Sequence, residues 1–174
     1  MSAKQRVLKT FNLERTDRVT IGYDANQAVH DRFAKALNIK ADDRECMLQA
    51  LGVDYRYVGA PYIGPMLYKE LPDRVTDPVD GFNMRWISHQ SGGYWDFCDF
   101  PLAGADDETI SRFPVANPND FDYRSVAGQI EEKREYALFV AGNAIPDIIN
   151  ATGRVMGMED TLYNLAVGHE ATLD

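Results

Sequence analysis

Apolar and polar positions follow two periods along the chain, one typical of helices and one typical of strands. Near the N-terminus, apolar residues recur with helical spacing, and Ser2 and Gln5 stand at the spacing of a capping box. β-Branched and aromatic residues then gather at 18–23 and at 53–58, and an unbroken apolar run covers 137–141. We predict strands at these three runs. The last run predicts a strand buried on both faces, as in a parallel sheet.

Helical periodicity returns between the predicted strands. Two β-rich runs between residues 81 and 101 flank Gly92 and Gly93, and this pattern predicts a β-hairpin because glycine readily adopts the positive φ of a tight turn. Alternation of strands with helices predicts an α/β protein. We therefore expect a single domain over residues 1–174, folded as a partial (βα)8 TIM-type barrel with a hairpin insertion at about 81–101.

The chain is too short, and has too few predicted strands, for a complete barrel. A complete barrel takes about 250 residues, whereas the chain has 174. Three neighbouring strands would leave an apolar sheet edge, which favours pairing with another chain. We therefore expect either self-association or a second chain that supplies the rest of the barrel.

The charge balance narrows the classes of partner. The chain has 27 acidic and 18 basic residues, for a formal net charge of -9. A negative protein repels a phosphate backbone, and no basic stripe is present, so we expect no nucleic-acid partner. No apolar run approaches the roughly 18 residues of a membrane helix, and the polar start is unlike a signal peptide. We expect no membrane partner and a cytoplasmic location.

The histidines and cysteines do not show the spacing of a metal site. His30, His89 and His169 stand far apart, and Cys46 and Cys98 lie in different predicted elements. We predict no metal site and no cofactor held by this chain alone. We expect His30 on the solvated side of its helix.

Several short motifs resemble the uroporphyrinogen decarboxylase-like family, and together they extend over nearly the whole chain. Each motif is short, and the match lies in their order and spacing. The motifs are Arg6-Val7-Leu8 with Thr16-Asp17-Arg18-Val19, Leu51-Gly52-Val53-Asp54, the hairpin leading into Phe100-Pro101-Leu102-Ala103, Val140-Ala141-Gly142, and Gly157-Met158-Glu159.

The resemblance implies a (βα)8 barrel and one of two chemistries, decarboxylation of uroporphyrinogen or methyl transfer between a corrinoid and a thiol. In the decarboxylases, arginines in the first-strand loop hold substrate carboxylates and an aspartate follows the second strand. Here, residues 23–27 contain no arginine and residues 59–62 contain no carboxylate. We therefore expect a relative of the corrinoid-dependent methyltransferases that is incomplete as a catalyst on its own. For a complete protein, the family implies a corrinoid, zinc and a corrinoid protein as partner.

A ligand pocket, if one forms, should follow the strand ends. There, Tyr23, Asp24, Tyr62 and Asn143 are candidates for substrate binding, and no residue is assigned to catalysis. Tyrosines can stack on a planar ring, and asparagine both donates and accepts hydrogen bonds. Each candidate also has a structural interpretation: Asp24 can cap the next helix and the tyrosines can simply pack. The alternative function is a non-catalytic fragment or assembly subunit that complements a second chain.

Overall fold

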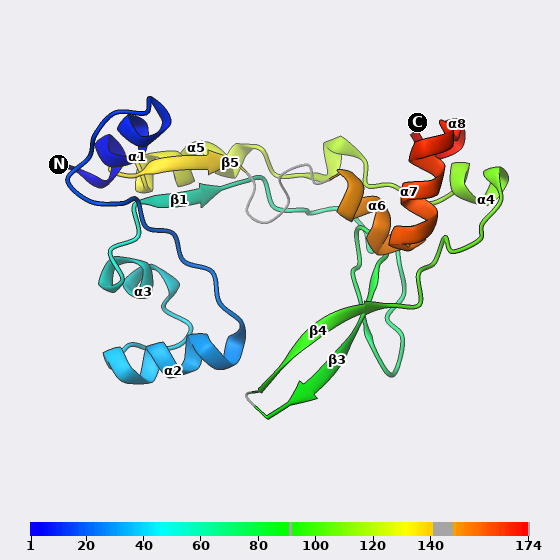
Figure 1. Ribbon diagram of the computed structural model, residues 1–174, viewed down its shortest axis with the longest axis horizontal. Coiled ribbons are helices and arrows are strands. Elements are labelled where there is room, and N and C mark those ends of the chain that lie inside the picture. The colour runs from blue at the N-terminus through cyan, green and yellow to red at the C-terminus, as the bar shows by residue number, and fades with distance from the viewer. Residues whose placement is uncertain (91, 141–147, 174) are drawn as a thin grey trace. The chain divides into compact units, whose positions relative to one another are not determined.

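The structure is a computed structural model that describes residues 1–90, 92–140 and 148–173. Contacts along the chain group into two compact units, and Figure 1 shows their elements. Unit 1 contains Met1–Pro61 and the described part of Asp122–Asn143; unit 2 contains Tyr62–Phe121 and the described part of Ala144–Asp174. The expectation of a single domain stays a prediction.

The helices of unit 1 begin at polar caps. Helix α1 has the predicted capping box, because the Ser2 hydroxyl accepts from the Gln5 amide and the Gln5 side chain accepts from the Ser2 amide, each at 3.1 Å. Helix α2 is capped by Asn26, which accepts from the Val29 amide at 2.9 Å, so Asp24 is not the cap of this helix. The helices of this unit are α1 (Ala3–Phe11), α2 (Gln27–Leu37), α3 (Arg44–Ala50) and α5 (Arg124–Glu132).

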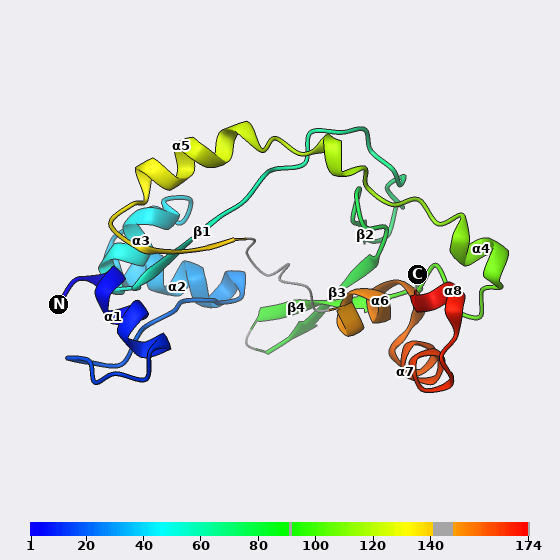
Figure 2. The same ribbon diagram turned by 90° about the horizontal axis from the view of Figure 1, so that it is seen from above.

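Two of the three predicted strands adjoin each other in unit 1. Strands β1 (Tyr55–Val58) and β5 (Ala137–Val140) are parallel, with Tyr55 opposite Ala137 and Val58 opposite Val140. Helix α1 contacts both strands, and α5 contacts β1 (Figure 2). Each strand pairs along one edge only within the described residues.

The predicted partial TIM-type barrel is wrong. Residues 18–23 form no strand, and the described strands make one parallel pair and one antiparallel sheet that do not close. Ile21 does approach the start of β1, since its carbonyl accepts from the Asp54 amide at 3.0 Å. However, the Ile21 amide donates to the Asp54 carboxylate at 2.8 Å instead of to a neighbouring backbone. The Asp54 carboxylate thus accepts the hydrogen bond that the Ile21 amide would otherwise donate to a neighbouring strand, and the pairing ends there.

Unit 2 contains the predicted hairpin, which is confirmed. Strands β3 (Asn83–His89) and β4 (Gly92–Cys98) pair antiparallel, and β2 (Val75–Thr76) adds to the other edge of β3. Helices α6 and α7 pack on each other, and α8 contacts α4 and α7. The remaining elements are α4 (Asp107–Ser111), the 3-10 helix η1 (Pro118–Asp120), α6 (Ile148–Met156), α7 (Met158–Val167) and α8 (Glu170–Leu173).

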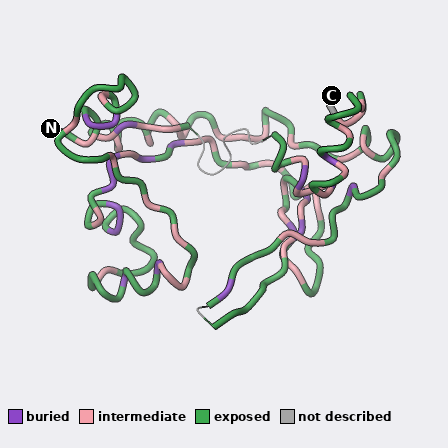
Figure 3. Tube along the Cα trace, viewed as in Figure 1, coloured by how far each residue is buried: buried purple, intermediate pink, exposed green. Residues whose placement is uncertain are grey.

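Burial is concentrated in short stretches (Figure 3). In unit 1, Met47 is fully buried, and Val7, Val53 and Val58 are nearly so. Many other large apolar side chains are exposed. The prediction that the 137–141 run is buried on both faces is wrong, because only Ala137 of β5 is buried and Val140 is 76% exposed. Among the described helices, none has the length and apolar character needed to cross a membrane.

Candidate functional site

A buried ion-pair network joins α1, the segment after it and the start of β1. The Asp54 side chain is almost completely buried and accepts from Arg6 Nη1 at 2.5 Å, Arg18 Nη1 at 2.6 Å and the Ile21 amide at 2.8 Å. Arg6 also holds Asp17 through two hydrogen bonds, from Nε at 2.7 Å and from Nη2 at 2.9 Å. Arg6 therefore bridges two carboxylates.

These contacts determine the charge state of the network. Burial alone would raise the pKa of Asp54, but the hydrogen bonds from Arg18, the Ile21 amide and Arg6 outweigh it and hold that pKa below its usual value. The hydrogen bond from Arg6 likewise holds the pKa of Asp17 well below the usual range. Both carboxylates are therefore ionised at neutral pH, and the network holds the loop of residues 12–26 against β1.

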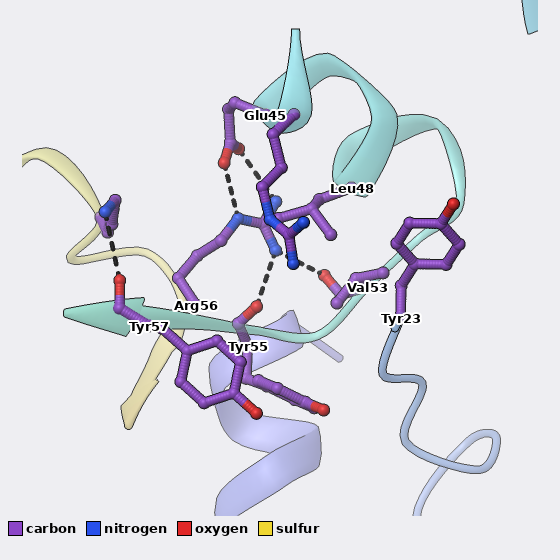
Figure 4. A pocket seen from close by; sticks show the side chains of 9 residues that line it. Tyr23, Glu45, Leu48, Val53, Tyr55, Arg56 and Tyr57 are labelled. Carbon is purple, nitrogen blue, oxygen red and sulfur yellow. Dashed lines mark hydrogen bonds and ion pairs between the residues drawn. The ribbon is translucent and has the colours of Figure 1, made fainter. Parts of the chain in front are cut away.

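A cavity of about 240 Å³ lies beside this network, between α3 and β1. Leu48 and Val53 form its apolar part, and the Tyr23 side chain faces the Glu45–Arg56 pair across them (Figure 4). Tyr55 and Tyr57 also line the cavity, although their rings project from the opposite face of β1. The cationic lining residues are Arg44, Arg56 and Lys133.

Arg56 is held in place by several partners. Its side chain is 2% exposed, and Nε and Nη2 donate to Glu45 at 2.7 and 2.9 Å. Nη1 donates to the carbonyls of Val53 and Tyr55 at 3.0 and 2.9 Å, and the guanidinium carbon lies 3.7 Å from the centroid of the Tyr136 ring. The hydrogen bonds from Arg56 lower the pKa of Glu45. The pair is thus neutral overall and largely structural.

The excess positive charge of the cavity therefore comes from Arg44 and Lys133. Lys133 Nζ donates to the Tyr57 carbonyl at 3.2 Å, which brings the ammonium group to the cavity edge. Arg44 occupies the first position of α3, and its guanidinium has no hydrogen-bond partner within the described part of the chain. Among the described residues neither cation forms an ion pair with a carboxylate, and two such cations make a suitable environment for a ligand anion.

Of the predicted site residues, Tyr23 lines the cavity, whereas Asp24 is not among its lining residues. The Tyr23 hydroxyl lies 3.1 Å from His30 Nδ1, and His30 Nε2 lies 2.8 Å from the Ala41 carbonyl. Since a carbonyl only accepts, Nε2 donates to it, and in the neutral imidazole Nδ1 then accepts a hydrogen bond from the Tyr23 hydroxyl. The prediction that His30 is solvated is wrong, because these two bonds hold it in a buried position. Burial, Tyr57 and the charge of Asp24 raise the pKa of Tyr55.

Tyr62, another predicted site residue, does not line the cavity. Tyr62 belongs to unit 2, where its hydroxyl donates to the Pro65 carbonyl at 2.7 Å and its ring packs edge-on against Phe121 at 5.2 Å. These contacts agree with the packing interpretation of this tyrosine. Asn143 lies outside the described residues.

Sequence reasoning missed Arg44, Glu45 and Lys133. All three lie in stretches of mixed charge, at 42–45 and 131–135, and such stretches are typical of a solvated helix. A usable signal was present in the strand itself. Arg56 is a charged residue between two tyrosines, and a buried charge on a strand calls for a carboxylate on the helix that covers it.

No three His, Cys, Asp or Glu side chains gather as a metal site in the described residues, and Cys46 and Cys98 are free thiols. These side chains do not provide the zinc set that the family resemblance implies, and no chemical step is assigned to zinc. In comparisons with known proteins, no family model, no curated protein and no solved structure matches the chain.

Proposed function

We propose that this chain is a uroporphyrinogen decarboxylase-like protein, related to the corrinoid-dependent methyltransferases rather than to the true decarboxylases. One observation carries the proposal: residues from two separate motifs of the resemblance meet in the buried network. Arg6, Asp17 and Arg18 come from the N-terminal motif, and Asp54 comes from the motif before β1. Because side chains from the two motifs form ion pairs with each other, the motifs belong to one structural unit, and this supports the view that they derive together from the same family. The barrel is not part of the proposal.

The cavity of unit 1 supports the binding of a small ligand that carries a carboxylate. Its volume of about 240 Å³ is below the roughly 300–1,000 Å³ of sites for drug-sized ligands. Arg44 and Lys133 supply positive charge in a chain of net charge -9. Leu48, Val53 and the Tyr23 ring suit the apolar part of the ligand. The proposed ligand is a small aromatic acid.

The ligand class can be tested with three simple probes in NMR titrations of the full chain. Benzoate should bind more tightly than benzamide, which has no charge, and more tightly than cyclohexanecarboxylate, which is not planar. Arg44→Gln should weaken benzoate binding about tenfold, since a hydrogen bond to a charged group contributes about 1.5–3 kcal/mol. Arg32→Gln, an exposed arginine of α2 away from the cavity lining, serves as the matched control.

Two results would contradict this assignment. Benzamide could bind as tightly as benzoate, which would mean that the positive charge selects nothing. Alternatively, Arg44→Gln and Arg32→Gln could weaken benzoate equally, which would indicate attraction to the chain as a whole and not to the cavity.

The cofactor and partner of the proposal follow from the resemblance alone. A corrinoid protein would deliver the methyl group, and the chain would need further zinc-binding residues for the thiol step. The expected location is the cytoplasm, whose reducing conditions suit two free thiols. Incubation of the full chain with methylcobalamin, zinc and a small thiol should give no methyl transfer. Turnover by the chain alone would contradict the proposal that it is incomplete as a catalyst.

The second candidate is an assembly subunit, and unit 1 provides a specific reason to consider it. Strand β5 has an unpaired edge within the described residues. Phe139 of this strand packs against Phe11 of α1, which is 68% exposed. Unpaired strand edges beside apolar side chains favour association. Val140→Asp should therefore reduce concentration-dependent association in sedimentation velocity. Val115→Asp, at a loop valine that is 82% exposed, is the control; a monomeric wild-type chain would contradict this candidate.

A further inference from the structure

The two tryptophans of the chain form one exposed pair on the hairpin of unit 2. Trp86 of β3 lies directly opposite Trp95 of β4, with ring centroids 5.4 Å apart and ring planes 68° apart. Trp86 is 45% exposed and Trp95 is 47% exposed. Both rings thus contact each other while still presenting large areas to solvent.

The same hairpin carries a second aromatic pair nearer its base. Phe82 and Phe97 are 5.4 Å apart, and Phe97 shares a face of β4 with Trp95 because the two are separated by two positions. The guanidinium carbon of Arg154, from α6, lies 5.0 Å from the Phe97 ring centroid and 5.9 Å from that of Phe82. This aromatic pair therefore already binds a cation from within the unit.

Gly93 leaves room for the Trp86 ring. A Cβ atom at position 93 would come within 2.3 Å of Trp86 Cζ2, so the indole lies directly against the backbone of β4. The backbone of Gly93 is buried beneath it. A substitution at this glycine therefore offers a way to displace the ring without removing it.

We propose that the Trp86–Trp95 pair binds an arginine side chain from a basic peptide segment of a partner protein. Tryptophan has the aromatic face most attractive to cations, and the Phe82–Phe97 pair next to it is already occupied in this way by Arg154. No cation of the described chain lies over the tryptophan pair in the same manner. The net charge of -9 favours approach of a basic segment. This site belongs to unit 2 and does not depend on the cavity of unit 1.

The chain offers a direct readout, because its tryptophan fluorescence comes from this pair alone. Acetylated tri-arginine amide should change that fluorescence on titration, whereas acetylated tri-citrulline amide, which has a similar shape without the guanidinium charges, should not. Gly93→Ala should weaken tri-arginine binding two- to fivefold, since a cation–aromatic contact at an exposed site contributes about 0.5–1 kcal/mol. Anisotropy of a labelled peptide gives the affinity for each variant.

Two further variants separate stacking from general charge attraction. Trp86→Leu should weaken binding at least as much as Gly93→Ala, and Arg154→Gln should leave it within twofold, because Arg154 occupies the other aromatic pair. Equal binding of tri-citrulline would overturn the proposal in favour of an uncharged planar ligand. Unchanged affinity in both Trp86→Leu and Gly93→Ala would overturn it in favour of attraction to net charge only.

Discussion

Replacement of Asp54 by asparagine removes the buried charge on which the network of unit 1 depends, and keeps the size of the side chain. Asparagine can accept at one position only, so the hydrogen bonds from Arg6, Arg18 and the Ile21 amide cannot all remain. Removing one partner of a buried ion pair costs about 3–5 kcal/mol. Arg6 keeps Asp17, and the Arg18 side chain is 38% exposed and can be hydrated. The expected loss is therefore at the lower limit, about 3 kcal/mol.

Urea unfolding of the full chain measures this loss. With a slope of about 2 kcal/mol/M, the midpoint seen by far-UV circular dichroism should fall by about 1.5 M. Trp86 and Trp95 both lie in unit 2, so tryptophan fluorescence follows that unit separately and should shift less. Asp42→Asn, at an exposed aspartate of unit 1, is the matched control.

The pH dependence gives a second check on the same residue. Since the folded-state pKa of Asp54 lies below its usual value, its contribution is complete above the unfolded-state pKa and decreases as pH falls through the folded-state value. Asp54→Asn should flatten the acid limb of the stability profile. A destabilisation below about 1 kcal/mol, far under the cost of opening a buried ion pair, would refute this reasoning, as would an equal loss in Asp42→Asn.

Three further predictions concern single side chains. Glu45→Gln should cost about 1–2 kcal/mol in urea unfolding, since Arg56 is buried but Glu45 is 45% exposed and Arg56 keeps its two carbonyl acceptors. Gly22→Ala should destabilise unit 1 by about 1–3 kcal/mol in the same assay, because a Cβ there would lie 2.2 Å from the Tyr55 hydroxyl and the ring must move. Burial raises the pKa of Tyr68 to about 12, so alkaline absorbance titration should find one tyrosine that ionises last, and stability should fall as pH rises from the usual tyrosine pKa towards 12.

Local features of the fold could be predicted from the sequence because they depend on residues close together in the chain. The capping box at Ser2 is a contact between neighbours, and the hairpin around residues 83–98 follows from its glycines and β-rich flanks. The strand at 137–140 was evident from its apolar run. The barrel prediction failed at residues 18–23, where composition favoured a strand but a carboxylate distant in sequence took the backbone amide of Ile21.

The candidate site was less predictable for a related reason. Tyr23 could be proposed as a site residue because it follows a β-rich run, but Glu45 is positioned by a tertiary contact with Arg56, and Arg44 precedes Glu45 on the same helix. Whether Arg56 or Tyr57 faces the covering helix depends on which side of β1 that helix packs. Periodicity along a single strand indicates that the two sides differ, and it does not indicate which helix covers each.

The interleaved order of the two units has a consequence for synthesis on the ribosome. Strand β1 emerges early, yet its partner β5 follows only after the hairpin and α5 have been made. At about 5–20 residues per second, β1 waits on the order of ten seconds for that partner. During this interval the nascent chain exposes the unpaired aromatic strand β1. We therefore expect chaperones to bind the N-terminal segment, and unit 1 to fold only once the nascent chain is long enough to include β5.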